Sequence, residues 1–123
     1  CKIFSNKISF KTIYREIYKK LKKKKKFEVF VDQKIHLLNL EDFLFIILKL
    51  LNKKKSIVGN FNLVGKKITR FEFSNLISKK FNLNSKFIVP IKFNKNKFSY
   101  IPKNLDLKSN LYRTIKFKPN FRI

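Results

Sequence analysis

Apolar residues along the chain fall into short blocks whose spacing alternates between that of helices and that of strands. Over 10–22 they recur at intervals of three and four, which places them on one helical face, and Ser9 is positioned to cap that helix. The aromatic and β-branched segment 27–31 is typical of a strand, and 32–34 of a turn. Residues 1–4 have the pattern of the end of another strand. The first third of the chain therefore predicts strand, helix and strand.

The middle of the chain predicts an unusually apolar helix. Asn39 is a favourable N-cap, and the helix expected from there to about Leu51 is apolar on almost all sides. Such a helix has to be covered on most of its surface, which a chain of 123 residues achieves with difficulty. The alternating segment 58–64 then predicts a strand that Gly65 ends. We therefore expect part of the cover for the helix to come from outside the 123 residues.

The last part of the chain begins with a helix signal. Thr69 and Glu72 have the spacing of a capping box, in which the hydroxyl and the carboxylate bind free backbone N–H groups at a helix start. This helix is expected to run to about Phe81, followed by a strand at 87–91 and a short helical turn at 109–114. The order β-α-β-α-β-α-β indicates the α/β class, in one domain that spans residues 1–123.

Lysine dominates the polar positions. The 31 basic and 7 acidic residues give a formal net charge of +24, and only four of the basic residues are arginine. Two explanations stay open. A very AT-rich genome would enrich Lys and Asn at neutral surface positions, which makes the charge a bias of composition. Alternatively, the surface is selected to bind a polyanion, although proteins that bind phosphate favour the planar fork of arginine.

The remaining composition excludes several classes of protein. A single cysteine, Cys1, rules out a disulfide framework and a cysteine-based metal site. The longest apolar stretch, 37–51, is interrupted by polar residues and is too short to span a bilayer, and no signal peptide is visible. We expect a cytoplasmic protein. Because the chain starts at Cys1 and contains no Met, we also expect a fragment of a longer one.

Short motifs follow one another along nearly the whole chain, and their order is more informative than any one of them. They are Cys1-Lys2-Ile3-Phe4, Phe30-Val31-Asp32-Gln33, Leu40-Glu41-Asp42-Phe43, the run from Gly59 to Gly65, Thr69-Arg70-Phe71-Glu72-Phe73, Ile88-Val89-Pro90-Ile91, Ile101-Pro102-Lys103-Asn104 and Lys116-Phe117-Lys118-Pro119. In this order and spacing they resemble the substrate-binding region of the dTDP-4-dehydrorhamnose reductases, which belong to the extended short-chain dehydrogenases.

The resemblance implies an α/β fold that is the C-terminal half of an extended short-chain dehydrogenase: the end of the parallel sheet plus the small α/β substrate-binding lobe. The intact parent would transfer a hydride from NADP or NAD to a keto-sugar nucleotide. The implied partners are a nucleotide-sugar substrate and the missing N-terminal, dinucleotide-binding half. The chain lacks the Gly-rich turn that binds the cofactor pyrophosphate, so we expect this fragment alone to bind no cofactor, and we assign no metal site.

Two positions depart from the family pattern. The stretch after Gln33 is Ile35-His36-Leu37-Leu38, where the family has Gly-Ser-Pro-Thr, and Ile101 stands in place of an arginine. An arginine at that position would suit a diphosphate. Lys103, a point charge, is the candidate to replace it.

Five residues are candidates for substrate binding. The resemblance implies that Ser9 and Phe10 open a helix whose start faces the nucleotide, where the helix dipole attracts phosphate and Phe10 can stack on a base. Gln33 can hydrogen-bond a base, His36 follows in the loop expected there, and Lys103 completes the set. Each also has an ordinary structural alternative, as a helix cap, a core aromatic, a turn residue, a buried polar side chain or a solvated lysine.

Catalysis in the family needs a Tyr-x-x-x-Lys pair, whose lysine lowers the pKa of the phenol. Tyr18 with Lys22 and Tyr112 with Lys116 match the spacing, which chance explains in so lysine-rich a chain. Both also lie after the place of the family's pair, which falls upstream of Cys1. We therefore assign no catalytic residue.

Two other functions stay open because of the charge. A small lysine-rich RNA-binding protein, such as an organellar ribosomal protein, should line one face with basic residues that include arginine. Residues 19–26 are rich enough in lysine to contact anionic lipid. Because the lysines are placed mostly in turns and at helix ends, we expect neither a specific nucleic acid nor a membrane as partner.

Overall fold

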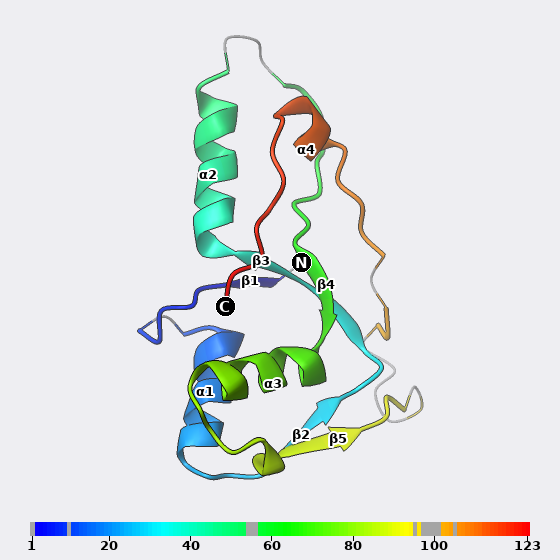
Figure 1. Ribbon diagram of the computed structural model, residues 1–123. Helices are drawn as coiled ribbons and strands as arrows, with labels where there is room; N and C mark the ends of the chain where they lie inside the picture. The colour runs from blue at the N-terminus through cyan, green and yellow to red at the C-terminus, as the bar shows by residue number, and fades with distance from the viewer. Residues whose placement is uncertain (1, 10, 54–56, 95, 97–101, 105) are drawn as a thin grey trace.

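A computed structural model describes residues 2–9, 11–53, 57–94, 96, 102–104 and 106–123 (Figure 1). The strands are β1 (Lys2–Phe4), β2 (Phe27–Phe30), β3 (Lys34–Asn39), β4 (Lys66–Thr69) and β5 (Ile88–Ile91). The helices are α1 (Ile13–Lys22), α2 (Leu40–Leu51), α3 (Arg70–Lys80) and α4 (Leu111–Thr114), with a 3-10 turn at Ser85–Phe87.

The strands form two small sheets. β3 is the central strand of the first, with β1 parallel on one side and β4 antiparallel on the other. β2 and β5 form a separate parallel pair. Parallel neighbours need a long crossover connection, and both pairs are joined through helices. The architecture is therefore α/β with parallel strands, as the sequence predicted.

The larger core lies between α1, α3 and the strands in the lower half of Figure 1. α1 buries Tyr14, Ile17 and Leu21, which follow one another at the helical spacing of three and four. Phe4 of β1 meets Phe73 of α3 edge to face, with ring centroids 5.3 Å apart. Such a pair adds about 0.5–1.5 kcal/mol beyond the burial of its surface. Aromatic contacts thus join the first sheet to the helices below it.

A second, smaller core joins α2 to the end of the chain at the upper end of Figure 1. Its buried residues are Leu38, Ile46, Leu111 and Ile115. The N–H of Asn120 donates to the Asp42 carboxylate over 2.7 Å and ties the C-terminal segment to the first turn of α2. One side of α2 is therefore covered by the chain itself.

The start of α1 differs from the prediction. The helix begins at Ile13 with Thr12 as its N-cap, whereas Ser9 lies in an exposed turn and does not cap it. The Ser9 carbonyl accepts a hydrogen bond from Arg15 Nη1 over 3.2 Å, which holds the turn against the first turn of the helix.

Two predictions in the middle of the chain are also wrong. The described residues of 57–65 form no strand, and β4 begins only after Gly65. The expected loop after Gln33 is strand β3, which places His36 in the sheet. A Cβ on Gly65 would lie 2.7 Å from Leu38 Cα and nearer still to the Leu37 carbonyl. Glycine therefore permits the close approach after which β4 pairs with β3.

The predicted caps of α2 and α3 are confirmed. Asn39 Oδ1 accepts from the N–H of Glu41 over 3.0 Å. The N–H of Glu72 donates to Thr69 Oγ1 over 3.1 Å, and the Glu72 carboxylate accepts from the Thr69 N–H over 2.8 Å, so both halves of the capping box form. Among the helices of the described residues, none has the length and apolar character needed to cross a membrane.

Candidate functional site

The turn between β2 and β3 brings two of the candidate residues together. Gln33 is buried, and its Nε2 donates to the Pro102 carbonyl over 3.0 Å. The N–H of Lys34 donates to the Lys103 carbonyl over 3.2 Å. The Lys103 ammonium lies 3.0 Å from the Asp32 carboxylate. These contacts hold the later segment against the start of β3, and we call them the clamp.

Asp32 is a member of the clamp that the sequence did not single out. Its carboxylate accepts from the N–H of Phe93 over 2.8 Å and pairs with Lys103. The Phe93 N–H first, and Lys103 second, hold the pKa of Asp32 below its ordinary value. A carboxylate directly after a strand is a common turn residue, so its position alone gave no signal of these long-range contacts. The clamp engages the same polar groups of Gln33 and Lys103 that substrate binding would use.

His36 is separated from solvent by the sheet around it. Only 5% of the residue is exposed, and its Nδ1 lies 3.3 Å from the Gly65 carbonyl oxygen. On the neighbouring strand, Lys67 pairs with Asp106 over 2.8 Å. His36 thus has the surroundings of a buried polar residue of a strand.

The other candidates lie apart from the clamp. Ser9 belongs to the blue turn before α1, on the left in Figure 1, whereas β3 starts on the right. Phe10 and Ile101 lie outside the described residues. The structure therefore brings Gln33 and Lys103 together but does not bring Ser9 to them, and the substrate-binding roles of all five candidates stay predictions.

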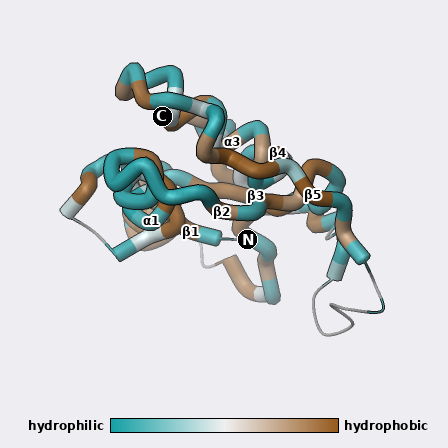
Figure 2. Tube along the Cα trace, turned by 90° about the horizontal axis from the view of Figure 1, so that it is seen from below, coloured by the Kyte–Doolittle hydropathy of each residue, from teal (hydrophilic) through white to brown (hydrophobic). Residues whose placement is uncertain are grey.

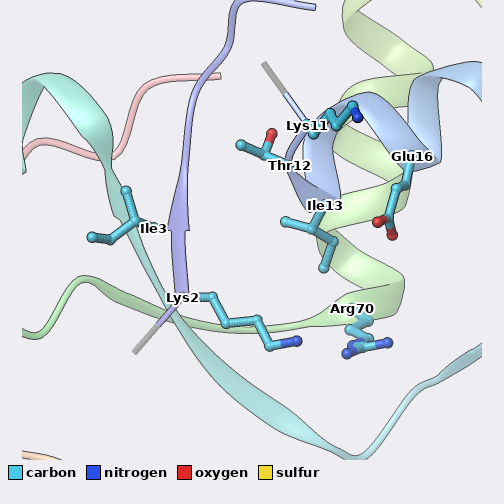
Figure 3. A pocket seen from close by; sticks show the side chains of 7 residues that line it. All are labelled: Lys2, Ile3, Lys11, Thr12, Ile13, Glu16 and Arg70. Carbon is cyan, nitrogen blue, oxygen red and sulfur yellow. The ribbon is translucent and has the colours of Figure 1, made fainter.

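A hollow of about 340 Å³ beside the first turn of α1 contains groups suited to an anion (Figure 3). We call it the basic hollow. It is lined by Lys2, Ile3, Lys11, Thr12, Ile13, Glu16 and Arg70. Figure 3 shows Lys2 of β1 and Arg70 of α3 extending toward one another, with Lys11 and Glu16 on the other side. Three cations and one carboxylate therefore surround it, from β1, α1, α3 and the segment just before α1.

The donors around the basic hollow are incompletely used. Thr12 is the N-cap of α1, yet its side chain makes no capping hydrogen bond. Thr12 Oγ1 and Arg70 Nε are buried and have no hydrogen-bond partner among the described residues. The first N–H groups of a helix also lack intrahelical partners and carry partial positive charge. No motif in the sequence predicts this hollow, because Lys2, Thr12 and Arg70 meet only through the fold.

The surroundings of Tyr112 are those of a structural residue. The Tyr112 hydroxyl donates to the Val64 carbonyl and accepts from its N–H, both over 2.7 Å. Burial raises the pKa of Tyr112, the opposite of what a catalytic phenol needs. Within the described ranges, no three His, Cys, Asp or Glu side chains gather as a metal-binding group.

Two surfaces lack a covering layer among the described residues. β1 pairs only with β3, so its other edge is open, and Ile3 is 42% exposed. On α2, Leu44, Leu48 and Leu51 follow one another along one side and are 52%, 56% and 75% exposed. We call the free edge of β1 and this stripe the open face. Exposed apolar stripes mark interaction surfaces, and a free edge accepts a further strand.

Two solved structures are similar in fold to this chain. The chain matches the crystal structure of dTDP-4-dehydrorhamnose reductase from Bacillus anthracis str. Ames in complex with NADP, with a TM-score of 0.74 and 19% identity, over 95% of this chain and 41% of that one. The chain has the fold of part of that reductase. A hypothetical dTDP-4-dehydrorhamnose reductase from Sulfolobus tokodaii matches with a TM-score of 0.58 and 28% identity, over 76% of this chain and 31% of that one.

The likeness to the reductases rests on structure. No protein-family model and no curated protein matches the sequence. The resemblance predicted from the ordered motifs is confirmed as a likeness of fold, and the comparisons do not favour the RNA-binding alternative. The chain spans less than half the length of either reductase.

Proposed function

We propose that this chain is the substrate-binding part of an NAD(P)-dependent sugar-nucleotide reductase. The observation that carries the proposal is the fit of 95% of the chain to part of a reductase crystallised with NADP. In the intact parent, a hydride would pass from the nicotinamide to the carbonyl carbon of a keto-sugar nucleotide, and a proton to its oxygen. The cofactor would leave oxidised. The residues of this chain would bind and orient the sugar nucleotide.

The proposed partner of the open face is a dinucleotide-binding half. A further parallel strand beside β1 would continue the first sheet, and its flanking layer would cover Leu44, Leu48 and Leu51 of α2. Removing apolar surface from water contributes about 25 cal/mol per Å². Two observations support this placement: the chain covers 41% of the first reductase, and three leucines along one side of α2 are exposed.

The proposed contact for the phosphates of the substrate is the basic hollow. A nucleotide sugar carries a diphosphate, which binds well where a helix start and cationic side chains converge. Lys2, Lys11 and Arg70 supply the charge, and the Thr12 hydroxyl supplies a buried polar group without a partner among the described residues. α1 is also the helix whose start the resemblance placed against the nucleotide. Ser9 lies four residues before the first residue of α1, and a contact of Ser9 and Phe10 with the ligand stays part of this proposal.

Ligand binding to the 123-residue chain tests this proposal. Saturation-transfer NMR would be recorded with dTDP-glucose, dTDP and NADP. We expect signals from the first two, which share the diphosphate and the base; NADP also carries a diphosphate, so its signal measures how much of the binding the diphosphate alone provides. The double variant Lys11→Gln/Arg70→Gln should lower the affinity for dTDP-glucose at least tenfold, since two charge-assisted contacts contribute about 1.5–3 kcal/mol each.

A matched control removes the same charge elsewhere. Lys92 and Arg113 are exposed and lie outside the basic hollow, so Lys92→Gln/Arg113→Gln should leave the affinity unchanged within about twofold. Equal losses in both double variants would assign the binding to net charge and contradict a phosphate site. Absence of any transfer from dTDP-glucose to the unmodified chain would contradict the proposed function itself.

A further inference from the structure

The lysines near the end of α1 meet others that are distant in sequence. Seven of the eight residues from 19 to 26 are exposed lysines, and Leu21, the eighth, is buried. Lys79 and Lys80 end α3, and Lys86 lies in the 3-10 turn that follows, all three exposed. We call these ten residues the lysine-rich end: Lys19, Lys20, Lys22, Lys23, Lys24, Lys25, Lys26, Lys79, Lys80 and Lys86.

Specific contacts bring these segments together. Tyr18 of α1 and Phe81, directly after α3, lie with ring centroids 4.7 Å apart. A hollow of about 430 Å³ is lined by Lys22 and Lys24 from one segment and by Asn82 and Asn84 from the other. The Lys80 ammonium lies 5.9 Å from the centre of the Tyr14 ring. What the sequence shows as separate lysine runs is therefore one surface at the lower end of Figure 1.

Few carboxylates lie near this surface. Glu16 precedes Lys19 by one turn of α1, and Glu28 follows Lys26 by two residues. Of the remaining acidic residues, Asp32, Glu72 and Asp106 are engaged by other partners. Lysine at a helix end offsets the helix dipole, but two helix ends need far fewer than ten charges. The lysine-rich end thus carries a local excess of positive charge.

The side chains of the lysine-rich end suit a plane of negative charge better than phosphates that are bound in a fixed geometry. All ten cations are lysine, and none is the planar arginine that binds phosphate or base edges in a fixed geometry. Figure 2 views the molecule from below and shows a hydrophilic connection between α1 and β2. Among the described residues, Leu76 of α3 is the one exposed large apolar residue on the segments that form this end, at 39%, and a single such residue gives little surface to insert between acyl chains. A plane of lipid headgroups can contact a protruding end at several lysines at once.

We propose that the lysine-rich end is a docking surface for an anionic lipid membrane, bound by electrostatic attraction alone. Polybasic segments gain about 1 kcal/mol per lysine near anionic lipid, which is about fivefold in the partition coefficient. At 0.15 M ionic strength, charges beyond about 8 Å are screened. Local clustering, and not the net charge of the whole chain, therefore sets the binding. The proposal does not depend on the sugar-nucleotide function.

Vesicle sedimentation with the 123-residue chain tests the proposal at about 0.15 M salt. The probes are vesicles of phosphatidylserine and phosphatidylcholine in equal parts, and vesicles of phosphatidylcholine alone. We expect binding to the first and none to the second. Replacing Lys22 to Lys26 by Gln removes five charges from the lysine-rich end and should lower the partition coefficient at least a hundredfold.

The control variant replaces five exposed lysines elsewhere by Gln: Lys7, Lys92, Lys108, Lys116 and Lys118. Both variants lose the same charge, and each changes one lysine with positive φ, 53° at Lys24 and 48° at Lys116. The control should retain binding within about fivefold, the effect of one lysine. Circular dichroism and dTDP-glucose binding, unchanged in both variants, would show that the fold and the basic hollow are intact.

Three outcomes would overturn the membrane proposal. Equal losses in the two variants would show that only net charge matters. Binding to phosphatidylcholine alone would show that headgroup charge is not what is recognised. Tighter binding of single-stranded oligouridine at the same salt, lost in the Lys22–Lys26 variant and kept in the control, would assign this surface to nucleic acid instead.

Discussion

Tyr14, which is buried, and Tyr112, which is half-buried, differ in whether their hydroxyl groups find partners among the described residues. Tyr14 is fully buried in the larger core, and its hydroxyl has no hydrogen-bond partner among the described residues. The Tyr112 hydroxyl makes two hydrogen bonds to Val64. A buried polar group without a partner costs about 1–3 kcal/mol, whereas a satisfied one stabilises. The same chemical change should therefore have opposite effects at the two positions.

We expect Tyr14→Phe to raise the free energy of unfolding by about 1 kcal/mol and Tyr112→Phe to lower it by about 1–2 kcal/mol. Urea denaturation of both variants beside the unmodified chain measures the two effects. Each variant is the control for the other, because both lose one hydroxyl and keep the ring. A loss of stability in Tyr14→Phe as large as that in Tyr112→Phe would show that the Tyr14 hydroxyl has a partner.

Gly65 is the residue on which the pairing of β3 with β4 depends. A Cβ there would lie 2.7 Å from Leu38 Cα and would meet the Leu37 carbonyl more closely still. Backbone atoms of a central strand cannot move aside, so Gly65→Ala should lower the free energy of unfolding by about 3 kcal/mol or more.

Gly59 supplies the comparison for that substitution. Its φ of +137° disfavours alanine, but the nearest atom to a Cβ is in the Phe61 ring at 3.3 Å. Gly59→Ala should therefore cost only the backbone strain, about 1–2 kcal/mol. If urea denaturation shows that the two variants lose the same free energy of unfolding, Gly65 does not approach β3 closely.

At the scale of elements, the capping box of α3 couples stability to pH. The Thr69 N–H first, and its hydroxyl second, lower the pKa of Glu72 below its ordinary 4.5. A pKa that is lower in the folded state stabilises the fold above the ordinary pKa, and this contribution is lost as the pH falls through the folded value. Glu72 therefore supports α3 at neutral pH and ceases to do so in acid.

Thr69→Ala should cost about 1–2 kcal/mol at neutral pH, because it removes the hydroxyl half of the box. The cost should shrink in acid, once the pH has fallen below the lowered pKa of Glu72 and the carboxylate has gained a proton in both proteins. Urea denaturation at the two pH values measures the difference. In Glu72→Gln, which cannot titrate, the difference in free energy of unfolding from the unmodified chain should also shrink in acid. A difference that does not change with pH would show that Glu72 takes no part in the capping box.

The sequence predicted helix caps, which depend on local contacts, better than it predicted strands, which depend on pairing with distant segments. The caps at Asn39 and Thr69 are short-range contacts, and both were found because the residue types and spacing determine them. Strand β3 was missed because its run Ile35 to Leu38 does not alternate; both its faces are buried, which the sequence alone does not distinguish from a loop or helix start. Residues 58–64 alternate, yet no partner strand lies beside the described part of that segment.

At the scale of the whole molecule, the order of motifs predicted the fold, whereas the five candidate site residues stay predictions. Gln33 was chosen for its amide, which donates to Pro102, a residue far along the chain. The basic hollow combines Lys2, Thr12 and Arg70 from three elements, and no short motif contains them. The groups that we propose as substrate contacts meet through long-range packing, which a pattern along one segment does not show.

The charge of the molecule should make its stability rise with salt. A net charge of +24 over 123 residues repels itself more strongly in the compact state than in the unfolded chain. Among the described residues, two ion pairs act against this repulsion: Lys67 with Asp106, and Lys103 with Asp32. The side chains of both pairs are partly open to solvent, and such pairs contribute about 0–1 kcal/mol. The repulsion therefore outweighs the attraction.

Sodium chloride shortens the Debye length from about 30 Å at 0.01 M to about 10 Å at 0.1 M and so weakens this repulsion. We expect the free energy of unfolding to rise over that range, on the order of 1 kcal/mol, as followed by thermal and urea denaturation. Both five-lysine variants should be less sensitive to salt than the unmodified chain, because they carry less charge to screen. The Lys22–Lys26 variant should show the smaller response, since its charges lie closest together and repel most. A stability that falls with added salt would mean that ion pairs, and not repulsion, govern the fold.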